Sequence, residues 1–231
     1  MGRPIKWSFQ PDKRHEAIAK DACGGYEKLK ADIAEKEKML AGENYDATSP
    51  ELWERWQLAK RLQSEYNNTP MTDTGRLSAL LDLLLGSYGE HVWISAPFFV
   101  DYGENIHIGH HVEINMNCVF LDCNRITIGN YSGIGPGVHI YTVFHPTNPA
   151  ERRNENAAFW NSSTAPVVIG DYVWIGGRSV ILPGVTVGNG TTIGAGSVVT
   201  HSIPSGVVAV GNPCHVIRAI TDEDKKTCWN R

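Results

Sequence analysis

Aliphatic residues recur at every sixth position through the C-terminal half of the chain. A helix places apolar residues about 3.6 positions apart and a strand about 2 apart, so a sustained period of six indicates a stack of short, equivalent segments. The same period occurs earlier in the chain, interrupted once by two extra residues. Its members are Ile108, Ile114, Phe120, Ile128, Ile134, Ile140, Ile169, Ile175, Ile181, Val187, Ile193 and Val199.

This repeat predicts a mainly β fold, a parallel β-helix in which each repeat forms one strand and one bend. The aliphatic residue points into a stacked core, and three repeats complete one coil. Glycine follows the aliphatic residue at Gly170, Gly176, Gly188 and Gly194. We expect these glycines to supply the backbone freedom that each corner needs. The pattern does not fix the hand of the coil.

Composition restricts the possible partners. The chain has 231 residues, of which 42% are hydrophobic and 20% charged, as in a protein with a sizeable core. A net charge of −4 offers no basic surface for nucleic acid, and no apolar run approaches the roughly 20 residues of a membrane span. The start lacks the apolar block of a signal peptide. The five cysteines show no CxxC spacing, which indicates reduced thiols in a cytoplasmic protein and no metal site.

Before the repeats, the sequence predicts a helical segment. Ser49 is an expected N-cap, and Pro50 is an expected first helical residue of a helix that runs to about Tyr66. The other two helices are expected at 26–40 and 74–85. We therefore divide the chain into a polar N-terminal arm at 1–25, a helical segment at 26–90, the β-helix at 91–220 and a C-terminal tail at 221–231.

A long excursion interrupts the repeats at residues 141–166. A loop of this length inside a compact repeat is usually functional. It contains His145, and the fixed φ of the following Pro146 restricts the histidine. A lone loop histidine is more often a solvated residue, but its place in this excursion favours a functional role.

Seven further segments carry a more specific pattern: KMLAGENYDATSPEL, FFVDYGENIHIG, NMNCVFLD, GPGVHIYTVFHP, IGDYVWIGGRSVILPGVTVG, IGAGSVVT and VGNPCHVIRAI. Over about residues 30–224, the chain resembles the maltose O-acetyltransferase branch of the sugar acetyltransferases, whose relatives include galactoside acetyltransferase and the nodulation acetyltransferase. The resemblance implies a left-handed coil. It also implies direct transfer of acetyl from acetyl-CoA to a sugar hydroxyl in a ternary complex, and a homotrimer with active sites between neighbouring coils.

Two residues match the catalytic positions of that family. His145 matches its catalytic histidine, and an imidazole suits a general base because its ordinary pKa is near 6.5. Asn115 matches an asparagine that stabilises the oxyanion, for which an amide N–H is a suitable donor. The alternative for Asn115 is a corner residue that bonds the local backbone.

By the same resemblance, four residues match the acceptor-binding positions of the family. Carboxylates and arginine suit this role because they bind sugar hydroxyls in pairs. The structural alternative for each is a surface charge or a turn cap, and for the arginine a solvated helix face. One relative carries a carboxylate where this chain has Cys123, so the preferred acceptor stays open. The four are Asp46, Arg55, Asp101 and Asp122.

The resemblance places acetyl-CoA along the later coils. Trp174 would pack on the pantetheine arm, although a tryptophan can also simply cover the side of a solenoid. Arg218 would meet a CoA phosphate. His201 and His215 stand where many relatives carry a basic residue, so the phosphate contact here could depend on pH. The remaining expected contacts are Gly177, Ala195 and Thr200.

Three functions stay open on the sequence alone. The first is a sugar O-acetyltransferase. The second keeps the fold but acetylates an amine or an antibiotic, and the helical KMLAGE segment argues against it. The third is a non-catalytic repeat scaffold, against which the joint presence of His145, Asn115 and Trp174 argues.

Overall fold

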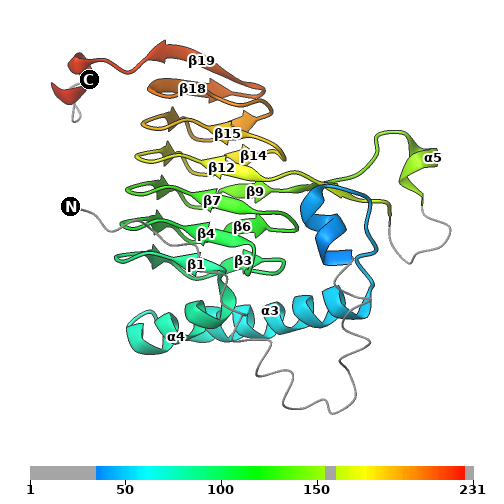
Figure 1. Cartoon of the computed structure of the whole chain (residues 1–231). Helices are drawn as coiled ribbons and strands as arrows, with labels where there is room; N and C mark the ends of the chain where they lie inside the picture. The colour runs from blue at the N-terminus through cyan, green and yellow to red at the C-terminus, as the bar shows by residue number, and fades with distance from the viewer. Residues whose placement is uncertain (1–34, 154–159, 227–231) are drawn as a thin grey trace, which may run out of the picture.

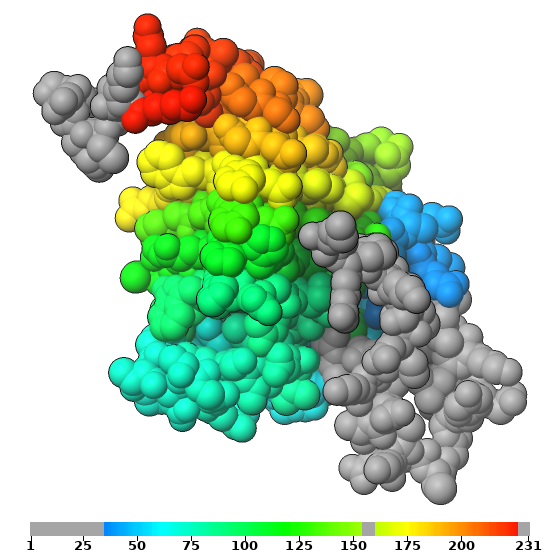
Figure 2. Space-filling model, turned by 60° about the vertical axis from the view of Figure 1, so that its left-hand side comes forward, coloured from blue at the N-terminus to red at the C-terminus, as the bar shows by residue number. Residues whose placement is uncertain are grey.

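The computed structural model describes residues 35–153 and 160–226, so the expected arm at 1–25 lies outside the described residues. From Ser87 onward the chain forms a parallel β-solenoid of about six turns, with three sheets around one core. Figure 1 shows the coils stacked in one column, with helices at its base. The space-filling view in Figure 2 shows the same order as successive colour bands, so each coil lies directly on the preceding one.

Each full coil contributes one strand to each sheet. Sheet A contains β1 (Ser87–Tyr88), β4 (Ile106–Ile108), β7 (Ile126–Ile128), β12 (Val167–Ile169) and β15 (Thr186–Val187). Sheet B contains β2 (Trp93–Ile94), β5 (Glu113–Ile114), β8 (Gly133–Ile134), β13 (Trp174–Ile175), β16 (Thr192–Ile193), β18 (Val207–Gly211) and β19 (Cys214–Ala219). Sheet C contains β3 (Phe98–Val100), β6 (Cys118–Leu121), β9 (His139–Tyr141), β14 (Val180–Ile181) and β17 (Val198–Val199).

The six-residue period is confirmed as the core of this solenoid. All twelve of its members are buried, none with more than 5% of its surface exposed. The strand register aligns them coil above coil, for example Ile114 beside Ile134 and Ile134 beside Ile175. The strands of the three sheets pair in parallel except at the top, where β18 and β19 form an antiparallel pair. The repeat therefore specifies both the inward face and the register.

The glycines of the repeat have a different role from the one expected. Gly176 does not adopt the left-handed backbone that favours glycine; instead, a Cβ there would overlap the backbone nitrogen of Ala195 in the next coil. Left-handed corners occur elsewhere, several with bulky residues such as His111 and Tyr131. Glycine is thus required at Gly176 because adjacent coils approach closely, not because the corner needs a positive φ.

Two helices close the base of the solenoid. They are α3 (Pro50–Asn68) and α4 (Thr74–Leu84), close to the expected bounds, and residues 35–41 are also helical. The buried leucines of α4 join the main core, and the hydroxyl of Tyr66 donates to the carbonyl oxygen of Ile94 at 2.6 Å. Ser49 occupies the N-cap position of α3, but its side chain makes no cap hydrogen bond. Ser49 is therefore the N-cap residue by position, but its hydroxyl does not make the expected capping hydrogen bond.

The excursion leaves the solenoid at the corner between sheets C and A. It departs as β10 (Val143–Phe144) and returns as β11 (Ser163–Thr164), which pair as an antiparallel ribbon. A short helix, α5 (Pro149–Arg152), lies between them. The helical residues 35–41 dock at its base, where the side-chain amide of Asn124 donates to the carbonyl oxygen of Leu40 at 3.1 Å and to the side-chain oxygen of Thr164 at 2.8 Å. The 3-10 helix Asp222–Lys226 follows the last strand.

Candidate active site

A cavity of about 570 Å³ lies where the excursion, the start of α3 and the first coils meet. It rests on a second small core that is separate from the main core of the solenoid and contains Met39 and Leu52. The expected residues His145 and Asp101 both line it. The complete lining is Tyr45, Ala47, Trp53, Trp56, Asp101, Tyr102, Cys123, His145, Trp160 and Ser162.

The ring of His145 is held in one orientation. Its Nδ1 lies 3.0 Å from the carbonyl oxygen of Asn161 and 3.2 Å from the hydroxyl of Ser162. A carbonyl oxygen only accepts, so in the neutral ring Nδ1 is the nitrogen that carries the proton and Nε2 is the one with the lone pair. The ring also packs edge-on against Trp160, with centroids 5.3 Å apart. The tautomer set by Asn161 therefore assigns the basic position of the neutral ring to Nε2.

The deep end of the cavity combines a carboxylate with weakly polar groups. The thiol of Cys123 lies 3.5 Å from Oδ2 of Asp101, and Lys60 lies 3.3 Å from Oδ1. Burial raises the pKa of Cys123, and the charge of Asp101 adds to this effect. Burial likewise raises the pKa values of Tyr45 and Tyr102, so both phenols stay neutral. Asp101 is therefore the carboxylate available at this end.

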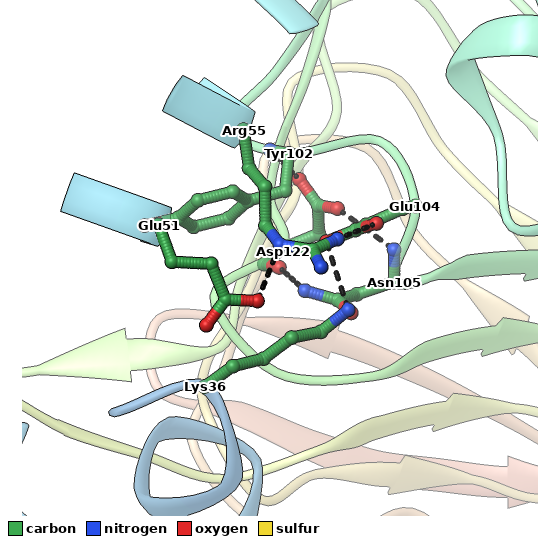
Figure 3. Close-up of polar contacts among 7 residues, drawn as sticks. All are labelled: Lys36, Glu51, Arg55, Tyr102, Glu104, Asn105 and Asp122. Carbon is green, nitrogen blue, oxygen red and sulfur yellow. Dashed lines mark hydrogen bonds and ion pairs between the residues drawn. The ribbon is translucent and has the colours of Figure 1, made fainter. Parts of the chain in front are cut away.

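Asp122 is fully buried and lies beside Tyr102 and Asn105 (Figure 3). Its Oδ1 accepts from the backbone nitrogens of Asp101 and Tyr102, both at 2.9 Å, and Oδ2 accepts from that of Asn105 at 3.3 Å. Burial raises its pKa to about 7, while the backbone donors act in the opposite direction. Within this chain, Asp122 holds the loop that presents Asp101 and Tyr102 to the cavity.

Arg55 lies in a charged cluster beside the same loop, shown in Figure 3. Its Nε donates to Glu51 at 2.8 Å and its Nη1 to Glu104 at 2.9 Å, and Lys36 lies 3.0 Å from Glu104. Burial lowers the pKa of Arg55, but the charges of Glu104 and Glu51 outweigh burial and raise it. The cluster joins α3, the loop around Glu104 and the helical residues at 35–41. Arg55 therefore connects α3 to the loop around Glu104, and Lys36 connects residues 35–41 to the same carboxylate.

We expect Arg55→Ala to lower the free energy of unfolding by about 1–3 kcal/mol, because two largely buried carboxylates lose a charged donor. Urea unfolding would measure this. As a control, Arg76 forms an exposed pair with Glu65, so Arg76→Ala should cost less than about 1 kcal/mol. Equal stability of the two variants, with a raised acceptor KM for Arg55→Ala alone, would instead indicate an acceptor contact.

The remaining expected acceptor residue, Asp46, stabilises a turn. Its Oδ1 accepts from the backbone nitrogen of Thr48 at 2.9 Å and from the hydroxyl of Thr48 at 2.6 Å. Its neighbours Tyr45 and Ala47 line the cavity, whereas Asp46 does not. Of the four expected acceptor residues, the structure thus brings only Asp101 to the cavity surface.

The expected cofactor residues and Asn115 lie elsewhere on the column. Asn115 follows strand β5 at the corner between sheets B and C, and its side-chain oxygen accepts from the backbone nitrogen of Met116 at 3.0 Å. Trp174 projects from the outer face of sheet B with 61% of its surface exposed. Neither lies in the lining of the cavity with His145.

The upper coils carry the other expected cofactor residues. Gly177 and Ala195 lie near the same corner as Asn115, on later coils. The hydroxyl of Thr200 lies 2.9 Å from Nδ1 of His201. Arg218 forms a two-point ion pair with Asp224 at 2.8 Å. The guanidinium of Arg218 is therefore paired within the chain.

Sequence reasoning missed most of the cavity wall, which is aromatic. Tyr45, Trp53, Trp56, Tyr102 and Trp160 come from four separated stretches of the chain. One signal was available, because Trp53 and Trp56 are three residues apart and so share one face of a helix. Among residues 35–153 and 160–226, no group of histidine, cysteine and acidic residues could hold a metal ion. In the same ranges, no helix has the length and apolar character to cross a membrane.

A β-helix of six-residue repeats with a histidine-bearing excursion defines the class of hexapeptide-repeat acyltransferases. The maltose acetyltransferase hexapeptide capping motif matches residues 38–89, and the bacterial transferase hexapeptide repeat matches residues 166–201. Galactoside O-acetyltransferase of Escherichia coli (strain K12) is 38% identical over 190 residues, which are 82% of this chain and 91% of that protein.

Solved structures agree with these matches. A maltose O-acetyltransferase from Clostridium difficile 630 is 41% identical with a TM-score of 0.78, over 81% of this chain and 98% of that one. A galactoside acetyltransferase in complex with coenzyme A is 36% identical with a TM-score of 0.79, over 84% and 95%. The chain therefore belongs to the family of maltose and galactoside O-acetyltransferases, and it is an acetyltransferase built on a left-handed parallel β-helix.

Proposed function

We propose that this protein transfers the acetyl group of acetyl-CoA to a hydroxyl of a sugar. Similar proteins are named for galactoside and maltose O-acetylation, and one similar structure holds coenzyme A. The observation that carries the proposal is the orientation of His145, which lines the same cavity as Asp101 and whose Nδ1 contacts the carbonyl oxygen of Asn161, so that Nε2 has the lone pair of the neutral ring.

In the proposed reaction, Nε2 of His145 takes the proton of the acceptor hydroxyl as its oxygen attacks the thioester carbonyl carbon. The tetrahedral intermediate then loses the sulfur of CoA, and the imidazolium returns the proton to that sulfur. The Asn161 carbonyl oxygen stabilises the imidazolium, because it accepts from Nδ1 at 3.0 Å throughout. No covalent enzyme intermediate is needed, so both substrates bind together.

The side-chain amide of Asn115 is proposed to donate to the oxyanion, since its oxygen already accepts from Met116. Within one chain, however, Asn115 lies at the corner of sheets B and C, whereas His145 leaves from the corner of sheets C and A. For both to act on one acetyl group, they must come from neighbouring copies. Head-to-tail contacts of this kind close into a ring. We therefore propose a homotrimer with three shared active sites.

Sedimentation equilibrium at micromolar concentration should give the mass of a trimer. Mixing His145→Ala with Asn115→Ala chains should restore part of the activity, because some interfaces of a mixed ring then carry both intact residues. An active monomer, or no restoration in mixed rings, would contradict a shared site.

Acetyl-CoA is proposed to lie along the outer groove of the upper coils. The exposed face of Trp174 would pack on the pantetheine arm, and the backbone at Gly177 and Ala195 would bond its amides. Thr200, His201 and Arg218 would then meet the adenosine and phosphate end. No metal is required for this chemistry.

His201→Lys is expected to tighten the binding of acetyl-CoA by about 0.5–1.5 kcal/mol, the size of one partly exposed charged contact, because a lysine carries a permanent positive charge toward a phosphate. Calorimetry on wild type, His201→Lys and His215→Lys would measure the three affinities. Equal affinities would show that neither position meets the phosphates of the cofactor.

An acceptor screen tests the proposed function. Acetyl-CoA would be incubated with maltose, glucose, galactosides and chitin oligomers, and the free thiol of CoA measured. Thiol release that depends on a sugar supports the proposal. Release that depends only on amines would indicate the amine-acetylating alternative, and no release with any acceptor would indicate a scaffold.

A cytoplasmic location is also proposed. The three cysteines among the described residues, Cys118, Cys123 and Cys214, are buried free thiols, as in a reducing compartment. Cell fractionation would test the location directly, and recovery outside the cytoplasmic fraction would overturn it.

A further inference from the structure

Three polar side chains of α3 bond the first strand of sheet C. This strand, β3, is at the edge of the sheet, so one side of its backbone has no partner strand. Asn67 bonds both backbone groups of Phe98, at 2.9 and 2.8 Å. Gln63 accepts from the backbone nitrogen of Val100 at 2.7 Å, and Lys60 donates to the carbonyl oxygen of the same residue. Because the three positions are three and four residues apart, they share one face of the helix, which is fixed against the strand.

Lys60 differs from the other two because it also contacts a carboxylate of the cavity. Its ammonium lies 3.3 Å from Oδ1 of Asp101 and 5.1 Å from the ring centroid of Trp56, which is one helical turn away. Asp101 and Trp56 both line the cavity, whereas Lys60 does not. The ammonium therefore holds the carboxylate from outside the cavity.

Asp101 is held at three points, one in its backbone and two in its carboxylate. Its backbone nitrogen donates to Asp122 at 2.9 Å, its Oδ1 contacts Lys60, and its Oδ2 lies 3.5 Å from the thiol of Cys123. A carboxylate has about four acceptor positions, two on each oxygen. These contacts use one position on each oxygen, so one on each is left for a ligand. Two neighbouring hydroxyls of a sugar fit such a pair, provided that the carboxylate does not rotate.

We propose that Lys60 is a positioning residue, which fixes the carboxylate of Asp101 in the orientation that accepts two hydroxyls of the acceptor. The inference rests on the proposed function, because it assumes that a sugar occupies the cavity. Lys60 is carried by a helix that is bonded to β3, so the carboxylate is oriented before the acceptor binds. Preorganisation of this kind increases affinity without a new contact to the ligand.

Lys60→Met is expected to raise the KM for the best sugar acceptor of the screen by about 5- to 30-fold, the scale of one hydrogen bond to a charged group. Methionine keeps an unbranched apolar side chain against Trp56. The kcat at saturating acceptor and the KM for acetyl-CoA should each change by less than about 2-fold, because His145 and the proposed cofactor groove are unaltered. Lys60→Arg should restore most of the affinity, since a guanidinium can donate to both Val100 and Asp101.

Gln63→Met is the matched control, because Gln63 bonds the same strand residue, Val100, and has no bond to Asp101. It should lower stability in urea, as Lys60→Met does, and leave the acceptor KM unchanged. A second comparison introduces Lys60→Met into Asp101→Ala and measures kcat/KM at low acceptor concentration. If the ammonium acts through this carboxylate, Lys60→Met should have no further effect in that background.

An unchanged acceptor KM in Lys60→Met, with wild type active on the sugar, would overturn this inference and leave the proposed function intact. An equal rise in Gln63→Met would also overturn it, because it would indicate a general loosening of α3. So would a full effect of Lys60→Met in the Asp101→Ala background, which would indicate a role independent of the carboxylate. If wild type acetylates no sugar, the proposed function and this inference both fail.

Discussion

Substituting His145 with alanine is expected to lower kcat by about 10²–10⁴-fold, the contribution of a general base. Acetyl-CoA binding should be unchanged, because His145 lies on the excursion and the proposed cofactor groove lies along the upper coils. His145→Asn is a sharper variant, since an asparagine amide can still donate to the carbonyl oxygen of Asn161 but offers no basic nitrogen. Steady-state kinetics with a saturating acceptor would measure kcat.

The control for His145 is another exposed histidine, His91, at a left-handed coil corner. His91→Asn should keep normal kcat, because asparagine tolerates that backbone conformation and His91 is far from the excursion in the coil order. Near-normal turnover of both His145 variants would show that the base is another group.

Phe98→Ala is expected to lower the free energy of unfolding by about 3–5 kcal/mol, as for other fully buried phenylalanines. Phe98 is completely buried and meets Phe120 edge-on, with ring centroids 5.1 Å apart, where α3 covers the first coils. The cavity left by its ring could not be refilled, because the coils above are fixed by their hydrogen-bonded register. Urea unfolding followed by circular dichroism would measure the loss.

The adjacent Phe99 provides the control, because successive residues of a strand face opposite sides. Phe99 is 38% exposed on the outer face of β3, so Phe99→Ala should change stability by less than about 1 kcal/mol. Similar losses for Phe98→Ala and Phe99→Ala would contradict the placement of the core at the base of the solenoid.

The solenoid could be predicted from the sequence, because its core consists of aliphatic residues that recur at every sixth position. Ile175 and Ile193 are equivalent positions of equivalent coils, so finding the period places both. The role of Gly176 could not be predicted in the same way, because it depends on how closely Ala195 approaches in the next coil. Spacing along the chain does not report distances between coils.

The candidate site was only partly predictable. His145 could be predicted because it lies in the excursion that interrupts the six-residue repeat. The sequence could not show that Arg55 and Asp122 bond other parts of the chain and do not line the cavity. Charged side chains of the same kinds serve both for buried contacts within a protein and for ligand contacts. Only the three-dimensional positions of Glu51 and Glu104 show that Arg55 binds other parts of the chain.

The central claim is that acetyl passes directly from acetyl-CoA to a sugar hydroxyl in a cavity that contains His145. The most direct measurement incubates the protein with acetyl-CoA carrying a ¹³C-labelled acetyl group and with the best sugar acceptor of the screen, and follows the label by NMR. We predict a new acetyl ester on a sugar oxygen, formed at similar rates by wild type and His91→Asn and at least about 100-fold more slowly by His145→Asn. Label that appears only as free acetate, or ester formed equally by His145→Asn, would contradict the account.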